Sequence, residues 1–276
     1  MLKQRILTAV ILIPLVVWGI LFQSTQVIAL IYAVLILQGS WEWSRLSGVN
    51  QVVIRAIYVA CIAALLWYLF KSGIGDSRLM LENAWLAVIW WCVAFVWILI
   101  PTLASQKNNL VVLLKLFVGV LVLTPSWYAL ANIHSLTGDG PVWLLYGLVL
   151  IWIADSGAYF AGRAWGKHKL APVVSPGKTW EGAMGGFVLV AIYAWVSSVW
   201  WLPVNAPQQY LFIGLSMALV PVSILGDLLE SLMKRQSGIK DSGNLLPGHG
   251  GVMDRIDSMT AVMPVYLWLL IMASIV

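Results

Sequence analysis

The sequence predicts an all-α, polytopic integral membrane protein with about nine transmembrane helices. Of its 276 residues, 61% are hydrophobic and only 10% are charged. The mean hydropathy is +0.91, and the chain contains 17 tryptophans. Soluble domains are about 25% charged. This composition therefore excludes a soluble globular protein and leaves a chain built to lie in lipid.

Nine apolar stretches are long enough to cross a bilayer, which takes about 20 residues in helical form. They lie at residues 6–22, 27–43, 52–70, 84–104, 110–130, 142–161, 181–201, 209–229 and 256–276. The first stretch follows Lys3 and Arg5 and therefore has the start of a secretory signal. No small-residue cleavage site follows it, so we expect a membrane helix there.

The lysines and arginines predict the orientation, because short cytoplasmic loops are enriched in them. With nine spans and a cytoplasmic N-terminus, all of these residues except Lys71 and Arg78 fall on the cytoplasmic side. The polar loops 162–180 and 230–255 then face the cytoplasm and bring eight basic residues to the membrane surface. Anionic headgroups and phosphorylated solutes are the expected partners.

The chemistry is concentrated in the second half of the chain. Up to about Asn132 the acidic residues are only Glu42, Asp76 and Glu82, whereas seven acidic and eight basic residues lie from Asp155 onward. Charged residues at a membrane edge are costly unless they are paired, hydrated or bound to an ion. We therefore divide the chain into an N-terminal scaffold, 1–135, with about five helices, and a chemically active region, 136–276.

Helical spacing groups several of these side chains. Asp227, Glu230, Ser231 and Lys234 stand at i, i+3, i+4 and i+7, so they share one face if the eighth span continues into the loop.

A second group of carboxylates begins the ninth span. Asp254 and Asp257 are three residues apart there, and Asp155 on the sixth span can add a third carboxylate. Carboxylates that converge from several helices suit Mg²⁺. The simpler alternative is that they pair with nearby lysines and arginines to make burial tolerable.

The loop before the ninth span, LLPGHGGVMDR, is rich in helix-breaking residues. Its glycines, Gly250 and Gly251 among them, leave backbone N–H groups accessible, as in a phosphate-binding turn that leads into a helix. His249 is suited to donate to a phosphate oxygen. An ordinary interhelical turn is the alternative.

The other polar loop contains SPGKTWEG, with Lys167 shortly before it. It approaches a Walker A loop, but Pro172 replaces the first required glycine and the composition excludes the soluble sheet of that fold. We interpret it as a separate phosphate-binding turn with Lys178 as the charge and Ser175 or Thr179 as hydroxyl donors. The alternative is a loop made basic only by the orientation bias.

The run from Ser231 to Asp257 resembles the signature of the phosphatidate cytidylyltransferases. The matching positions are Ser231, Lys234, Arg235, Lys240, Asp241, Gly243, Leu246, Pro247, His249, Gly250, Gly251, Asp254, Arg255 and Asp257. SPGKTWEG and ADSGAYFAG also resemble conserved regions of that family, and length and span number fit a bacterial member.

The resemblance implies transfer of CMP from CTP to phosphatidic acid in phospholipid biosynthesis, with CDP-diacylglycerol and pyrophosphate as products. It implies Mg²⁺ as the cofactor, with K⁺ as a candidate second ion. It also implies a homodimer in a bacterial inner membrane, with the active site on the cytoplasmic face. The expected catalytic residues are Asp227, Lys234, Arg235, His249, Asp254 and Arg255. The expected substrate-binding residues are Lys167, Ser175, Lys178, Thr179, Ser231, Lys240, Asp241, Gly250 and Gly251. The expected metal ligands are Asp227 and Asp254, followed by Asp257 and Asp155.

Two other classes compete with this interpretation. A cation-coupled transporter needs charges near mid-membrane, whereas those of this chain lie near the cytoplasmic ends of the spans. A CDP-alcohol phosphotransferase carries a different aspartate pattern, which is absent from the sequence. The basic residues fit no nucleic-acid motif, so we expect no nucleic-acid partner.

Overall fold

The computed structural model describes residues 13–106, 108–202, 204–243 and 250–275. Within these ranges, eight helices are long and apolar enough to cross a membrane. They are α2 (Thr25–Leu46), α3 (Val52–Gly73), α4 (Ser77–Leu99), α5 (Asn109–Ser135), α6 (Gly140–Trp165), α7 (Trp180–Trp200), α8 (Gln209–Ser237) and α9 (Met253–Met272). A short 3₁₀ turn, η1 (Ala206–Gln208), precedes α8. The predicted integral membrane fold is confirmed.

The first predicted span, 6–22, lies partly outside the described residues. Its described remainder, Ile13–Phe22, is an apolar helix. The other eight predicted spans each correspond to one of the helices α2 to α9.

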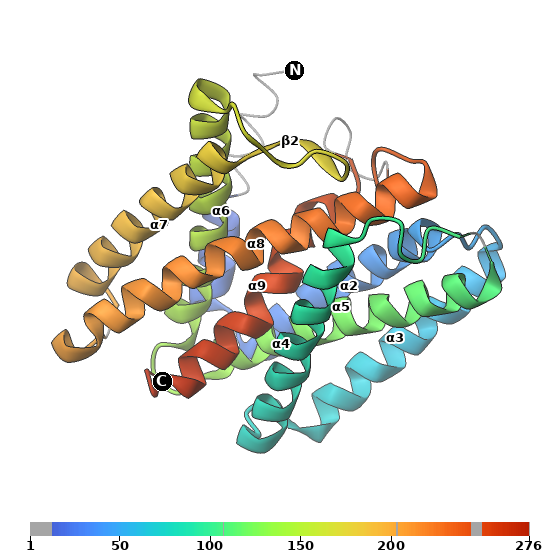
Figure 1. Cartoon of the computed structure of the whole chain (residues 1–276). Coiled ribbons are helices and arrows are strands. Elements are labelled where there is room, and N and C mark those ends of the chain that lie inside the picture. The colour runs from blue at the N-terminus through green and yellow to red at the C-terminus, as the bar shows by residue number, and fades with distance from the viewer. Residues whose placement is uncertain (1–12, 107, 203, 244–249, 276) are drawn as a thin grey trace.

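The bundle is organised around α9, which packs against α2, α4, α5, α6 and α8 (Figure 1). Most of its residues from Ile256 to Leu270 are buried, including Tyr266 beside Tyr146 of α6. Asp254 and Asp257 lie in the first turns of α9. Because α9 is central, both carboxylates lie near the centre of one end of the bundle.

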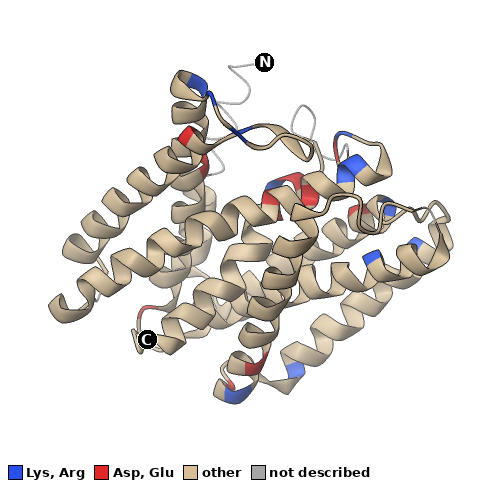
Figure 2. Cartoon of the chain, viewed as in Figure 1, with Lys and Arg blue, Asp and Glu red and all other residues tan. Residues whose placement is uncertain are grey.

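That end also carries the α2–α3 and α4–α5 connections, the segment between α6 and α7, and the start of α9. We call it the hairpin end. Figure 2 shows most of the charged residues along it, with a smaller group at the opposite end near the start of α4. This separation of the charged residues between the two ends agrees with the predicted distribution of lysines and arginines.

The connection between α6 and α7 contains the β1–β2 hairpin, which the sequence did not predict. β1 (Lys169–Ala171) and β2 (Ser175–Thr179) pair antiparallel, with Lys169 opposite Thr179. The loop 162–180 is thus an ordered platform that presents β2 to the ends of the helices.

Helices α6 and α7 approach closely because glycines face each other. A Cβ at Gly157 would lie 2.7 Å from the carbonyl oxygen of Gly185. A Cβ at Gly182 would lie 2.8 Å from the carbonyl oxygen of Ala158. Small residues permit this backbone contact between membrane helices. The contact sets Asp155 and Tyr159 of α6 beside the hairpin.

Helix α8 extends eight residues beyond the predicted span, because 229 was expected to be its last residue and Ser237 is. Lys234 pairs with Glu230 one turn earlier, which makes the polar continuation compatible with a helix. The helix ends where Gly238 adopts a left-handed conformation, φ 75°. The predicted common face of Asp227 and Glu230 therefore exists.

Candidate active site

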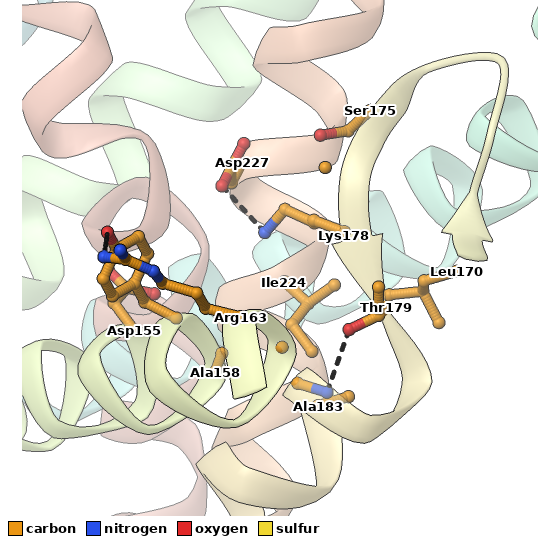
Figure 3. A pocket seen from close by; sticks show the side chains of 14 residues that line it. Asp155, Ala158, Arg163, Leu170, Ser175, Lys178, Thr179, Ala183, Ile224 and Asp227 are labelled. Carbon is orange, nitrogen blue, oxygen red and sulfur yellow. Dashed lines mark hydrogen bonds and ion pairs between the residues drawn. The ribbon is translucent and has the colours of Figure 1, made fainter. Parts of the chain in front are cut away.

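A pocket of about 520 Å³ lies at the hairpin end between α6, α7, α8 and β2. Its polar lining comes from these elements and includes Asp155, Arg163, Ser175, Lys178, Thr179 and Asp227. Figure 3 shows Lys178 and Asp227 pointing toward one another from β2 and α8. The pocket therefore brings the predicted polar loop 162–180 together with Asp227, which lies near the end of the predicted eighth span.

The ion pair between Lys178 and Asp227 is the central contact. Lys178 Nζ lies 2.7 Å from Asp227 Oδ2, and Ser231 Oγ donates to Asp227 Oδ1 over 3.2 Å. The Lys178 side chain is 22% exposed and that of Asp227 is 36% exposed, so the pair remains accessible from the pocket. It offers both a cation and a carboxylate to an entering ligand.

Contacts at the two ends of the β1–β2 hairpin hold Lys178 in position. Thr179 is buried, and its hydroxyl accepts a hydrogen bond from Gly182 N, which caps the start of α7. On the other side, the Glu181 carboxylate accepts hydrogen bonds from the backbone and ring of His168. Lys178 precedes Thr179 on β2, so these contacts fix the backbone that carries its ammonium group.

Two further carboxylates lie near Asp227. Asp155 lines the pocket from α6, and Asp257 on α9 interacts electrostatically with both Asp227 and Asp155. Asp257 Oδ1 also accepts a hydrogen bond from Ser258 N. Within the described ranges, no three Asp, Glu, His or Cys side chains already stand at metal-binding distance.

A second charged cluster lies about one to two turns further along α8. Lys234 Nζ is 2.7 Å from Asp254 Oδ1 and 2.7 Å from Glu230 Oε2. Asp254 Oδ2 accepts hydrogen bonds from Ser242 N and Gly251 N. Both carboxylate oxygens of Asp254 are therefore engaged, and this residue connects Ser242 and Gly251 to Lys234 of α8.

Glu42 on α2 completes this cluster, although the sequence analysis had assigned it to the scaffold. It is 3% exposed and accepts hydrogen bonds from Val252 N and Met253 N at the start of α9. Ser242 Oγ lies 2.9 Å from Glu42 Oε2 and 2.9 Å from Asp254 Oδ2. An acidic residue inside a predicted span is itself a signal of function, and it could have identified Glu42.

The glycines of this loop are required by space as well as by conformation. A Cβ on Gly251 would collide with the Ser242 hydroxyl and with Glu42 Oε2. Gly250 has φ 82°, which disfavours any residue with a side chain. Both glycines therefore serve the packing of the loop onto Glu42 and Asp254.

The remaining predicted site residues are more dispersed. Arg235 is exposed and its Nε donates to Val174 O, which connects α8 to the hairpin. Lys167, Lys240, Asp241 and Arg255 are exposed, and His249 lies outside the described residues. Arg163 lines the pocket and donates to the Tyr159 hydroxyl, a site position that the sequence analysis did not single out.

An apolar groove of about 580 Å³ adjoins the pocket. It is lined from α4, α7, α8 and the hairpin by residues that include Phe95, Leu99, Val173, Phe187 and Leu228. Leu170, Ala183 and Ile224 line both spaces. A polar pocket and an apolar groove thus share a wall at the hairpin end.

Comparison with known proteins assigns this architecture to a family. A family model described as "Cytidylyltransferase family" matches residues 3–273. Curated proteins named phosphatidate cytidylyltransferase are similar along nearly their whole length. The protein from Pseudomonas aeruginosa is 43% identical over 98% of this chain and 97% of its own. That from Haemophilus influenzae is 39% identical over 96% and 97%, and that from Bacillus subtilis is 32% identical over 99% and 98%.

The match covers both charged clusters, the hairpin and the helices that carry them. The resemblance seen in the sequence is thereby confirmed, and the chain belongs to the cytidylyltransferase family of nucleotidyltransferases.

Proposed function

We propose that this protein transfers the cytidylyl group of CTP to phosphatidate, which yields CDP-diacylglycerol and pyrophosphate. The observation that carries the proposal is the accessible Lys178–Asp227 pair in a polar pocket that shares a wall with an apolar groove. A water-soluble polyanion and a membrane lipid can meet only at such a junction. The names of the relatives support the same reaction.

The reaction needs little proton transfer. An oxygen of the phosphatidate phosphate attacks the α-phosphorus of CTP, a new P–O bond forms, and the bond to the β-phosphate bridge oxygen breaks as pyrophosphate leaves. The nucleophile is already an oxyanion, because a phosphomonoester carries about −1.5 to −2 charge near neutral pH. The protein must hold two polyanions together and stabilise charge on the leaving group.

We assign that work first to the cations around the pocket. Lys178 and Arg163 line it directly and bind phosphate oxygens, and the Ser175 hydroxyl donates from the same strand as Lys178. Thr179 keeps the strand in place through its hydrogen bond with Gly182 N. Lys234, paired with Asp254 and Glu230, connects α8 to the start of α9, and Arg235 and Arg255 extend the basic surface toward arriving nucleotide.

A magnesium ion fits this group by charge and by donor type. Asp227, Asp257 and Asp155 interact electrostatically, and Lys178 is the cation paired with one of them. Three carboxylates near one lysine leave negative charge that a hard divalent cation compensates. We propose that these carboxylates hold Mg²⁺, which when bound would supply Lewis-acid stabilisation of the phosphate charge.

Asp254 is less suited to ligate a metal in this arrangement. Its two oxygens already accept hydrogen bonds from Lys234, Ser242 and Gly251. We propose that it positions Lys234 and the start of α9. K⁺ and a homodimer remain expectations from the sequence.

The groove explains how the lipid reaches the reaction. Phosphatidate keeps its acyl chains in the bilayer, so its headgroup must enter sideways between helices. The groove between α4, α7 and α8 begins beside the pocket at Ala183 and Ile224 and is lined mainly by apolar side chains. We propose that it receives an acyl chain while the phosphate lies near Lys178.

We propose that the hairpin end lies at the cytoplasmic face of a bacterial inner membrane and that the protein serves phospholipid biosynthesis there. CTP is a cytoplasmic solute, and the hairpin end carries most of the basic residues (Figure 2). Positive residues near short loops favour the cytoplasmic side.

The test is turnover by the purified protein in detergent with phosphatidate. CTP is compared with ATP, GTP and UTP, each with and without Mg²⁺. Magnesium-dependent CDP-diacylglycerol from CTP, and no product from the purine nucleotides, is expected. Absence of product from folded, lipid-supplied protein would contradict the proposal.

A further inference from the structure

A second polar pocket lies at the hairpin end, apart from the candidate active site. It has a volume of about 460 Å³ and lies between the α2–α3 turn, the α4–α5 connection, the start of α5 and the end of α8. None of its lining residues belongs to the lining of the Lys178 pocket. The proposed reaction does not use it.

Lys115 is the most unusual residue of this pocket. It lies on α5, is only 5% exposed and lines the pocket. No hydrogen bond or ion pair connects its ammonium group to any residue that the structure describes. A buried ammonium is unfavourable unless a counter-ion or polar ligand compensates it. The Lys115 side chain is thus largely buried, and the pocket that it lines is the space from which water or an anion can reach its ammonium group.

The rest of the lining suits an anion. Arg45 adds a second cation, and the lining described by the structure contains no Asp or Glu. Asn50, Asn108 and Asn109 supply side-chain amides. Helix α5 begins at Asn109, so its positive N-terminal end faces the same space. Two cations, amide donors and a helix start are the usual components of a phosphate site.

We propose that this pocket binds a phosphate group, carried either by an anionic phospholipid headgroup of the adjacent leaflet or by a soluble phosphorylated molecule. The ligand's oxygens pair with Lys115 and Arg45 and accept from the amides around the start of α5. The chemistry that both sources share is a singly or doubly charged phosphate with accessible oxygens.

A phosphate bound in this pocket affects the candidate active site because both sites contact α8. Gln236 lines the pocket, and its Nε2 donates to Pro101 O and to Leu103 O of the α4–α5 connection, each over 2.9 Å. Lys234 lies two residues earlier on α8. A phosphate bound between α2, α5 and α8 braces the helix that carries Lys234 and Asp227.

The test measures the thermal unfolding midpoint of the full chain as anion is added. One arm adds inorganic phosphate or glycerol phosphate to the protein in neutral detergent, against sodium chloride at equal ionic strength. The other compares nanodiscs of phosphatidylcholine with nanodiscs that also contain phosphatidylglycerol. We expect a rise of about 5 °C at saturation in at least one arm, and the responding arm identifies the source.

Variants assign the rise to this pocket. In Lys115→Met, the anion concentration that gives half of the rise should be about tenfold higher or more, because one charge-assisted hydrogen bond is lost. Lys115→Arg should retain the wild-type concentration dependence. Lys71→Met is the matched control, because Lys71 lies on α3 over the Trp67 ring at the opposite end. Arg45→Met, at an exposed position, tests the same site if Lys115→Met fails to fold.

Two results would overturn the proposal. One is an equal response of Lys115→Met and Lys71→Met in every arm, which would assign the anion effect to another site. The other is the absence of any rise in the wild-type protein.

Discussion

At the scale of single residues, the site depends on two charged clusters that are adjacent on α8. Lys178 and Asp227 form the accessible cluster, whereas Glu42, Lys234 and Asp254 form the more buried one. Under the proposed function, the accessible pair exchanges its internal contact for substrate or metal. In the more buried cluster, both carboxylate oxygens of Glu42 and of Asp254 accept hydrogen bonds, and these contacts hold Ser242, Gly251 and the start of α9 together.

Replacement of Lys178 by methionine should reduce turnover about 100-fold or more, because a positioned cation that stabilises developing phosphate charge contributes that much. Lys169→Met is the matched control, since Lys169 is exposed on β1 and does not line the pocket. Initial rates of CDP-diacylglycerol formation at saturating CTP measure the effect. Equal losses in both variants would attribute the effect to the hairpin rather than to the Lys178 charge.

Replacement of Glu42 by alanine should destabilise the fold by about 2–5 kcal/mol, because two buried N–H groups at the start of α9 lose their acceptor. Glu82→Ala, which breaks an exposed pair with Arg78, should leave the unfolding midpoint nearly unchanged. Thermal unfolding in one detergent compares the two. A Glu42→Ala midpoint equal to that of Glu82→Ala would show that this acceptor is dispensable.

Sequence spacing predicted some of this chemistry and missed the rest for physical reasons. The shared helical face of Asp227 and Ser231 follows from spacing alone, and their contact is observed. The contact of Lys178 with Asp227 joins residues 49 positions apart, and spacing cannot reveal it. Glu42 lies 210 positions from Val252, so its role as acceptor for the start of α9 is visible only in the folded structure.

At the scale of secondary structure elements, the apolar helices were the most predictable part. Long hydrophobic runs leave the backbone in lipid no alternative to a helix. Strands of three and five residues, such as β1 and β2, carry too little pattern to be recognised. The predicted eighth span ended at residue 229, and its helical continuation was only a condition for the shared face of Asp227 and Glu230. Pairing of Lys234 with Glu230 keeps this polar end helical.

The glycine contact between α6 and α7 should be sensitive to one methyl group. In Gly157→Ala, the added Cβ would approach Gly185 O and separate the helices, which moves Asp155 away from the hairpin. We expect a loss of about 1–3 kcal/mol in stability together with a loss of activity. Gly214→Ala on α8 has no atom within 4 Å of the added Cβ and should be neutral or slightly stabilising. Thermal unfolding and turnover of both variants measure this, and an unchanged Gly157→Ala protein would contradict the packing argument.

At the scale of the whole molecule, the central α9 and the close α6–α7 pair bring separate parts of the chain to one end of the bundle (Figure 1). The scaffold is not separate from the chemistry, because α2 supplies Glu42 and α4 supplies part of the groove. Under the proposed function, the pocket and the groove form one reaction site with two routes of access, one from water and one from lipid.

The lipid route predicts a selective effect of Ala183→Phe, since Ala183 lines both the pocket and the groove. The larger side chain should raise KM for long-chain phosphatidate about tenfold and change KM for CTP much less. Val188→Phe is the control, because Val188 is 54% exposed on the same helix. Steady-state kinetics with each substrate varied in turn measure the effect. A parallel rise of both KM values would indicate general distortion of the site.

The central claim is that the Asp227–Lys178 pocket is where the cytidylyl group is transferred. The most direct test is the CTP-dependent turnover of Asp227→Asn, with Asp139→Asn as the matched control, because Asp139 precedes α6 at the opposite end. We expect at least about a 100-fold loss in Asp227→Asn and normal turnover in Asp139→Asn, with both proteins folded. Near-normal turnover of folded Asp227→Asn would contradict the account and place the reaction elsewhere.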